Sequence, residues 1–360
     1  MDTFYKILLF MILTTQSYSL YGQEKVLKKI AKTYTMTNAG KLTLENKYGD
    51  VIINGWDKNS IKITVNIKVV HRKKENAKSL LDRINIDVKN TNDFVLIRSE
   101  IADKNTGFFA KYFNKANPFD YDKTNIQIDY EIYMPLNAEV NISNKFGDVI
   151  LEDFTGKLKA TVQHGDMWIN DDLTNASLDV KFGKLDAKSI LYGSIRLKNG
   201  ELNLENSDNL RIDSSGTIIH IDSVSLLEIY SSKDNITINK LSEIKGEFQF
   251  SKVYLNTVEK EIKLSMNLAD FKVDNIIKRD AIIKINQVSS DLNINITNLA
   301  FSFNAKLEQG LLRIPKSFKN LKTTILDKGR KIRQITAGYG KKTSGKISFT
   351  GRKGIILLSE

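Results

Sequence analysis

Asn144-Lys145-Phe146-Gly147-Asp148-Val149-Ile150-Leu151 opens a stretch that repeats one short phrase as far as Pro315. Each copy is a turn followed by a short run that alternates apolar and polar residues. The first apolar residue after each turn recurs every 17 to 21 residues, at Val149, Met167, Leu185, Leu202, Ile219, Ile236, Val253, Phe271, Leu292 and Leu312. A fixed period of this size predicts stacked repeats, in which neighbouring units share one continuous core.

Each period holds a second alternating run about eight residues after the first. Strict alternation places one set of side chains inward and the other in water. The second runs are centred on Asp179, Arg196, Arg211, Glu228, Gln249, Lys263, Lys284 and Ser302. The pattern therefore predicts an all-β fold, a β-solenoid of the right-handed β-helix kind with two main sheets and rungs of about 17–21 residues. In the interior, Ile229 should lie between Ile212 and Phe248.

A left-handed hexapeptide helix has a similar period but predicts a different pattern. That fold has three short faces per turn, so one aliphatic residue should recur every six positions. Here apolar residues come in alternating pairs with eight or nine residues between pairs. The pattern favours the two-sheeted solenoid.

The chain divides into four regions by composition and pattern. Residues 1–22 resemble a signal peptide, because the apolar run Ile7–Leu13 is followed by small residues and is too short to span a bilayer. Residues 23–135 should hold one or more N-terminal rungs, a short helix over 72–81 and an irregular aromatic loop. A regular solenoid is expected over 136–326, and a basic capping hairpin over 327–360. We expect an exported protein, in the periplasm, on the outer surface or secreted, with no transmembrane span.

Residues 46–51 read Asn-Lys-Tyr-Gly-Asp-Val and match Asn144–Val149 at every position but one, where Tyr48 replaces Phe146. We interpret this early copy as a first or capping rung. A second N-terminal feature is the aperiodic stretch 102–124, which is rich in aromatic residues. Its rings either cover an open end of the solenoid or bind a partner; the candidate residues are Phe108, Phe109, Tyr112 and Phe113.

A family resemblance rests on several of these stretches. Tyr130–Pro135, Val140–Ile142 and Asn144–Val149, with Asn46–Trp56 and Gly345–Leu358, resemble the putative-adhesin β-solenoid family of exported bacterial proteins of unknown function, whose domain is of the auto-transporter adhesin head type. The resemblance implies a secreted or envelope-exposed solenoid, and the family offers no catalytic residues to carry over. From Leu202 onward the rungs often lack the turn glycine of the family pattern.

Motifs for chemistry are scarce. The chain has no cysteine, which excludes a disulfide framework and a catalytic thiol. His71, His164 and His220 are far apart and lack ligand spacing, and alternation places His220 outside. Gly-Asp pairs such as Gly147-Asp148 lack the glycine density of a calcium-binding repeat, so each Asp should bond its own backbone. We expect no metal and no cofactor.

Nucleophile and acid–base signatures are equally weak. The sequence contains no Gly-x-Ser-x-Gly elbow and no phosphate-binding glycine loop. Asp171-Asp172 is a poor candidate for a glycosidase pair. These observations argue against an enzyme.

Charge points to a different kind of contact. The net charge is +12, and nine Lys or Arg residues with no acid fall between Lys328 and Lys353. Such a block attracts anionic glycans, lipid headgroups or an acidic envelope protein, whereas export argues against nucleic acid. Alternatively, outward lysines keep strand edges from pairing. The candidate partner-binding residues are Lys331, Arg333, Lys341, Lys342, Arg352 and Lys353.

Two function classes remain open. One is a non-catalytic envelope or surface protein that presents a solenoid face for binding or adhesion. The other is a β-helix lyase or hydrolase that acts on polysaccharide, which should concentrate carboxylates, arginines and aromatics on one face. The outward positions show no such concentration: Asn203, Thr237, Tyr254, Lys272 and Asn293 on one sheet, and Asp179, Arg196, Arg211, Glu228, Gln249 and Lys263 on the other. The sequence favours binding.

Overall fold

The computed structural model describes residues 24–102, 125–341 and 344–360, and most of them lie in β-strands. The expected signal peptide over 1–22 falls outside the described residues. The chain forms two compact units. An all-β solenoid, as predicted, makes up the larger one.

The described part of the smaller unit comprises residues 24–29, 66–85, 100–102 and 125–127. It contains the helix α2 (Lys74–Asp82), close to the helix expected over 72–81, with Ala77 and Leu80 buried. Five strands contribute residues to both units: β1 (Glu24–Thr35), β4 (Ser60–His71), β5 (Ile84–Thr91), β6 (Phe94–Ile101) and β7 (Ile126–Pro135).

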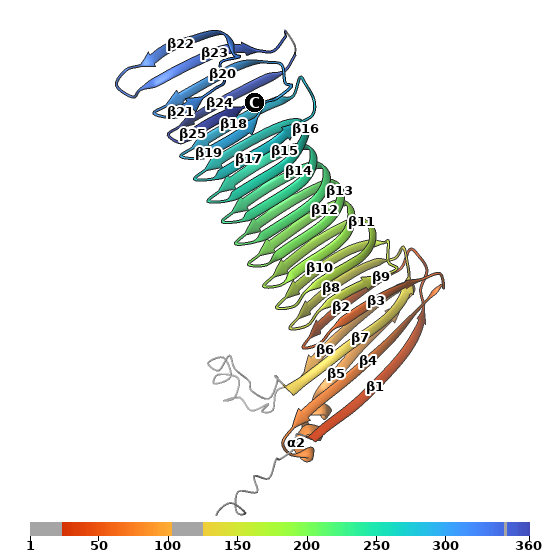
Figure 1. The fold of residues 1–360 in the computed structure, drawn as a ribbon. Helices are drawn as coiled ribbons and strands as arrows, with labels where there is room; N and C mark the ends of the chain where they lie inside the picture. The colour runs from red at the N-terminus through yellow and green to blue at the C-terminus, as the bar shows by residue number, and fades with distance from the viewer. Residues whose placement is uncertain (1–23, 103–124, 342–343) are drawn as a thin grey trace, which may run out of the picture. The chain divides into compact units, whose positions relative to one another are not determined.

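In the larger unit, strands β8 to β19 stack in chain order, coloured from yellow-green to blue in Figure 1. The strands of the solenoid are β2 (Lys41–Lys47), β3 (Val51–Trp56), β8 (Glu139–Lys145), β9 (Val149–Glu152), β10 (Lys157–Gln163), β11 (Met167–Lys181), β12 (Lys184–Lys198), β13 (Glu201–Ser215), β14 (Ile218–Ser232), β15 (Asn235–Gln249), β16 (Lys252–Asn267), β17 (Asp270–Ile276), β18 (Ile282–Val288), β19 (Asp291–Asn295), β20 (Phe301–Glu308), β21 (Leu311–Arg313), β22 (Lys319–Asp327), β23 (Ile332–Tyr339), β24 (Lys346–Arg352) and β25 (Ile355–Ser359).

A rung has two limbs joined by a bend. In β13 the first limb begins at Glu201, the bend lies near Ser207, and the second limb ends at Ser215. The two predicted runs of each period are thus one strand of 15 or 16 residues in β11 to β16, rather than two strands. The bends themselves stack on one another, as Ser207 does on Val224, so the parallel ladder continues through them.

The first-limb interior column matches its prediction. Val149, Met167, Leu185, Leu202, Ile219, Ile236, Val253, Phe271 and Leu292 are successive partners in the parallel ladders. Ile356 of β25 then lies between Leu292 and Leu312. Each apolar side chain therefore packs on the side chain one rung away, which gives the continuous core that the period implies.

The prediction for Ile229 is only half right. Ile229 is fully buried and pairs with Ile212 of β13, as expected. Its partner in β15, however, is Gly246 and not Phe248, which pairs with Ser231. A Cβ at Gly246, whose φ is +143°, would lie 1.8 Å from the Ile229 carbonyl oxygen. Only glycine fits this close approach of two backbones.

The early rung β2–β3 stacks directly on the rung that carries the same phrase. Asn46 pairs with Asn144 and Val51 with Val149, although 98 residues separate each pair in sequence. On its other side β2 pairs with β6, and β3 with β7. The early copy of the phrase is therefore a rung of the same ladder, as the sequence indicated.

The C-terminal end differs from the capping hairpin expected over residues 327–360. Strand β24 is parallel to β18 on one side and to β20 on the other, so β24–β25 is an interior rung. The end of the stack is formed instead by β23, antiparallel to β20, and by β22, antiparallel to β23. Ile347 and Phe349 of β24 are buried because both of their neighbouring rungs cover them.

A buried polar relay joins the early rungs. The Asn46 amide donates to the Asn144 side-chain oxygen at 3.1 Å, and Ser99 Oγ donates to the Asn46 side-chain oxygen at 2.9 Å. Ser99 therefore accepts from the Tyr130 hydroxyl, 2.6 Å away. Tyr130 is 1% exposed, and burial raises the pKa of its phenol to about 12, against a small opposing effect of the Ser99 hydrogen bond.

This shift predicts a loss of stability in alkali. The pKa of Tyr130 in the folded protein lies above its value of about 10 in the unfolded chain. The protonated phenol therefore contributes its full share of the folding stability below pH 10, and this share is lost as pH rises towards 12. The loss should be on the order of 2–3 kcal/mol. Urea unfolding of wild type and Tyr130→Phe at pH 9 and pH 12 measures it, since the other titrating groups are common to both proteins. A stability difference that stays constant with pH would contradict it.

Candidate binding face

The outward side chains of the first limbs form columns because the rungs are in register. One column runs from Trp168 through Asp186, Asn203, His220 and Thr237 to Tyr254. We call its four central members, Asp186, Asn203, His220 and Thr237, the polar column. Neighbouring parallel strands are about 4.8 Å apart, so Trp168 and Tyr254 lie about 24 Å apart.

Two adjoining hollows follow this face. The first, of about 520 Å³, is lined by the polar column and by the next outward column, which holds Lys188, Glu205, Asp222 and Asn239. The second, of about 460 Å³, begins at Thr237 and continues past Tyr254 and Lys272 to Leu357. Thr237 lines both hollows, which lie on opposite sides of its column, and we call the two together the groove.

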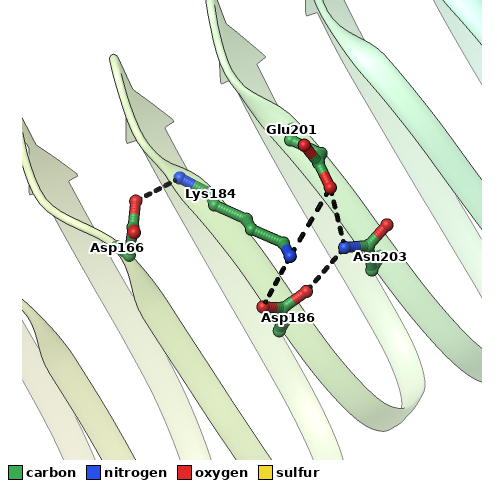
Figure 2. Close-up of polar contacts among 5 residues, drawn as sticks. All are labelled: Asp166, Lys184, Asp186, Glu201 and Asn203. Carbon is green, nitrogen blue, oxygen red and sulfur yellow. Dashed lines mark hydrogen bonds and ion pairs between the residues drawn. The ribbon is translucent and has the colours of Figure 1, made fainter.

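A network of hydrogen bonds and ion pairs holds the side chains at one end of the groove (Figure 2). The Lys184 ammonium lies 3.2 Å from Asp186 and 3.5 Å from Glu201. The Asn203 amide donates to Asp186 at 2.7 Å and to Glu201 at 2.9 Å. The hydrogen bond to Asp186 and the charges of Asp186 and Glu201 raise the pKa of Lys184, against a smaller effect of burial. Asp186 and Asn203 thus have fixed positions before any ligand arrives.

Aspartates after the turn glycines form a second ladder along the edge of this face. The backbone N–H of Asp166 donates to Asp148 at 2.8 Å, and that of Lys184 donates to Asp166 at 2.7 Å (Figure 2). The N–H of Asp148 likewise donates to Asp50. Each carboxylate therefore caps the next rung and not its own backbone, which corrects the expectation from the sequence. Their role is to join rungs.

Further along the groove, Tyr254 is held by its neighbours. Its hydroxyl donates to Asp274, and the Lys272 ammonium lies 2.9 Å from Asp274 and 5.1 Å from the centre of the Tyr254 ring. The hydrogen bond to Asp274 raises the pKa of Tyr254, and the same bond and the Lys272 ammonium lower the pKa of Asp274. Lys272 follows Tyr254 in the column, and its ammonium lies over one face of the ring.

The turns carry an aromatic ladder that sequence reasoning missed. Tyr48, Phe146, His164 and Phe182 stack with ring centres 5.5, 5.1 and 4.8 Å apart. All four have positive φ, and each precedes a turn glycine, which is the signal that could have revealed them. The facing sides of neighbouring rings therefore cover one another. His164 is a member of this stack, and His220 lies outside as expected, in the polar column.

The predicted basic residues are divided by the structure. Glu308 of β20 lies in register between Arg352 of β24 and Ile332 of β23. Lys331, Arg333, Arg352 and Lys353 therefore meet at one edge of the last rungs, and we call these four the basic edge. Arg333 donates to the Gly310 carbonyl at 2.9 Å. Lys341 follows the far end of β23 and is not part of this edge. Lys342, Phe108, Phe109, Tyr112 and Phe113 lie outside the described residues.

Neither aspartate of the weak glycosidase candidate is free. Asp171 accepts the backbone N–H of Asp153, and Asp172 lies 3.8 Å from the Lys188 ammonium. Across residues 24–102, 125–341 and 344–360, no three His, Cys, Asp or Glu side chains are grouped as metal ligands. No helix in these ranges is long and apolar enough to cross a membrane.

Comparisons with solved structures give distant matches. A putative adhesin from Parabacteroides merdae ATCC 43184 is 13% identical, with 74% of this chain and 92% of that chain covered and a TM-score of 0.36. A putative cell adhesion protein from Clostridium sporogenes ATCC 15579 is 10% identical, with coverages of 93% and 99% and a TM-score of 0.20. A putative lipid binding protein from Parabacteroides distasonis ATCC 8503 is 12% identical, with coverages of 74% and 92% and a TM-score of 0.30.

The names of the first two structures agree with the family that the sequence resembles. No protein-family profile matches the chain, and a comparison with curated proteins finds no match.

Proposed function

We propose that this chain is a non-catalytic binding protein of the cell envelope or surface, which acts after export and binds its partner through the outer face of the first limbs. The observation that carries the proposal is the groove of two adjoining hollows along that face, lined by polar side chains in register. It passes from the rung of Asp186 to the rung of Leu357.

A rigid ladder suits such a role. The groove-lining side chains stand on strands whose inner residues are buried, and the network around Asp186 fixes them further. A partner would therefore lose little free energy to ordering of the protein. The groove is shallow and long, so it fits an extended polymer or a protein surface better than a compact metabolite.

The alternative is an enzyme that cleaves polysaccharide. Such an enzyme needs a carboxylic acid and a second carboxylate across the scissile bond. Asp186 lines the groove and Glu201 lies beside it, and both hold Lys184 and Asn203 in place. Their contacts support a positioning role, and we propose that they take no part in bond cleavage.

The basic edge is a second candidate contact. It gathers Lys331, Arg333, Arg352 and Lys353 within neighbouring strands, which suits an anionic glycan, a lipid headgroup or an acidic envelope protein. It lies at one end of the stack, so a partner could touch it without entering the groove. Substitutions in the groove and in the basic edge can therefore show which of the two binds the partner.

Thr237→Arg should block the groove at its centre and lower binding at least tenfold. The probes are surfaces coated with neutral polysaccharide, acidic polysaccharide or phosphatidylglycerol vesicles, and surface plasmon resonance gives the affinity. Thr161→Arg is the matched control and should bind as wild type does, because Thr161 points outward from β10, which stacks on the second limb of β11.

Four outcomes would overturn the proposal. Wild type could bind none of the three surfaces, or Thr237→Arg could bind like wild type. Loss of binding only in Arg352→Glu/Lys353→Glu would move the contact to the basic edge. Release of soluble sugar from either polysaccharide would establish the enzyme instead.

A further inference from the structure

We infer that the groove binds a neutral glycan chain that lies along the polar column between Trp168 and Tyr254. The inference rests on the proposed function and adds to it the class, direction and length of the ligand. Three features of the described residues carry it: the chemistry of the column, the aromatic residue at each end, and the local charge.

The polar column presents a different hydrogen-bonding group on each rung. Asp186 offers a carboxylate, Asn203 an amide, His220 an imidazole and Thr237 a hydroxyl. Together they supply donors and acceptors at intervals of about 4.8 Å. A chain of sugar rings carries hydroxyl groups along its whole length and can bond each of these groups in turn. A peptide or an acyl chain offers no such regular row of hydroxyls.

Aromatic side chains stand at both ends of the polar column. A pyranose ring has a face of C–H groups that packs well against an aromatic ring, while its hydroxyls remain free for hydrogen bonds. The Tyr254 ring is held in place by Asp274, and the Lys272 ammonium lies over one of its faces. Trp168 stands next to Asp186 and is half-buried. Each end can therefore hold one sugar ring.

Local charge opposes an acidic ligand, although the chain carries a net charge of +12. The outward first-limb positions of β12 to β14 hold four carboxylates, on Asp186, Glu201, Glu205 and Asp222, and two ammonium groups, on Lys184 and Lys188. A polyanion would meet like charge along this part of the groove. A neutral glycan would not, and the carboxylates can accept its hydroxyl hydrogens.

The decisive experiment is a titration with neutral oligosaccharides of increasing length. Wild-type affinity should rise with chain length and level off once the ligand fills the distance from Trp168 to Tyr254. Trp168→Ala and Tyr254→Ala should each weaken binding of the longest oligosaccharide about tenfold. Tyr254→Phe keeps the ring but loses the hydrogen bond to Asp274, so it should weaken binding less than Tyr254→Ala does. Tyr192→Ala, which removes an exposed tyrosine of the second limb, should have no effect.

Fluorescence gives an independent readout of the contact. The chain has two tryptophans, so Trp56→Phe leaves Trp168 as the sole indole. In that protein the oligosaccharide should shift or quench the emission. Circular dichroism of every variant confirms that the fold is kept before binding is compared.

Failure of this inference is distinct from failure of the proposed function. Affinity that does not depend on length, or that is unchanged in both alanine variants, overturns the neutral glycan. So does preferential binding of acidic polysaccharide or vesicles. If those acidic ligands still lose affinity in Thr237→Arg, the groove remains the binding face and only the ligand class is wrong.

Discussion

Ile229→Asp should destabilise the central rungs by several kcal/mol, and it is the most damaging single substitution that we expect in the solenoid core. Ile229 is fully buried, beneath a rung in which Gly246 brings backbone rather than side chain to the same column. The new carboxylate would have no charged partner there. Burial of an unpaired charge is costly, so the protein would protonate the group or open the rung.

Graded substitutions at this position separate charge from volume. Ile229→Ala removes the buried methyl groups without adding charge and should cost about 2–5 kcal/mol. Leu226→Asp is the control, because Leu226 lies three residues earlier in the same strand and is 41% exposed. Urea unfolding gives the stabilities, and hydrogen exchange should show lost protection across β13 to β15. If Ile229→Asp and Leu226→Asp unfold at the same urea concentration, the buried column is wrong.

Asp234→Ala should be the second most damaging change, at about 3–4 kcal/mol. Asp234 is 2% exposed and accepts four hydrogen bonds. The Thr217 N–H and hydroxyl donate to one carboxylate oxygen at 2.7 and 2.8 Å, and the hydroxyls of Ser214 and Ser231 donate to the other at 2.7 Å. Alanine would leave these donors, one of them a backbone N–H, buried without an acceptor.

The matched control is Asp208→Ala, since Asp208 is exposed in the bend of β13. That change should alter stability by less than about 0.5 kcal/mol. Asp234→Asn should fall between the two, because an amide keeps the shape but only one oxygen can still accept. Thermal unfolding of the three variants tests the order. An Asp234→Ala protein as stable as Asp208→Ala would mean that water reaches the buried donors around position 234 and replaces the carboxylate as their acceptor.

The period of 17 residues and the alternation within it determined the architecture without coordinates. They placed Val149, Leu185 and Leu202 in one interior column, and they paired the phrase at Asn46 with its copy at Asn144. These predictions succeed because stacking one rung on the next requires the same residue class at the same position. A residue class that repeats with the period therefore indicates residues that contact one another in neighbouring rungs.

The sequence did not determine which residues of two neighbouring rungs are partners in the ladder. Gly246 and Phe248 are both inward, so alternation is equally satisfied by either as the partner of Ile229. The choice depends on where the turn falls, and Phe250, which resembles a strand residue, occupies the turn with a positive φ. A shift of two residues keeps every side chain on its face, and only the backbone ladder distinguishes the alternatives.

The same limit applies to the ends and to the binding face. Residues 346–359 resemble a strand pair wherever they are placed, and only tertiary structure puts β24–β25 between β18–β19 and β20–β21. Alternation showed that Asn203 and Thr237 point outward, but not that Asp186 and Glu201 both bond Asn203. The sequence determined this fold because the contacts between neighbouring rungs recur with the period of the sequence. Tertiary structure decided the groove, because a hollow depends on how side chains from separate rungs fill the space between them.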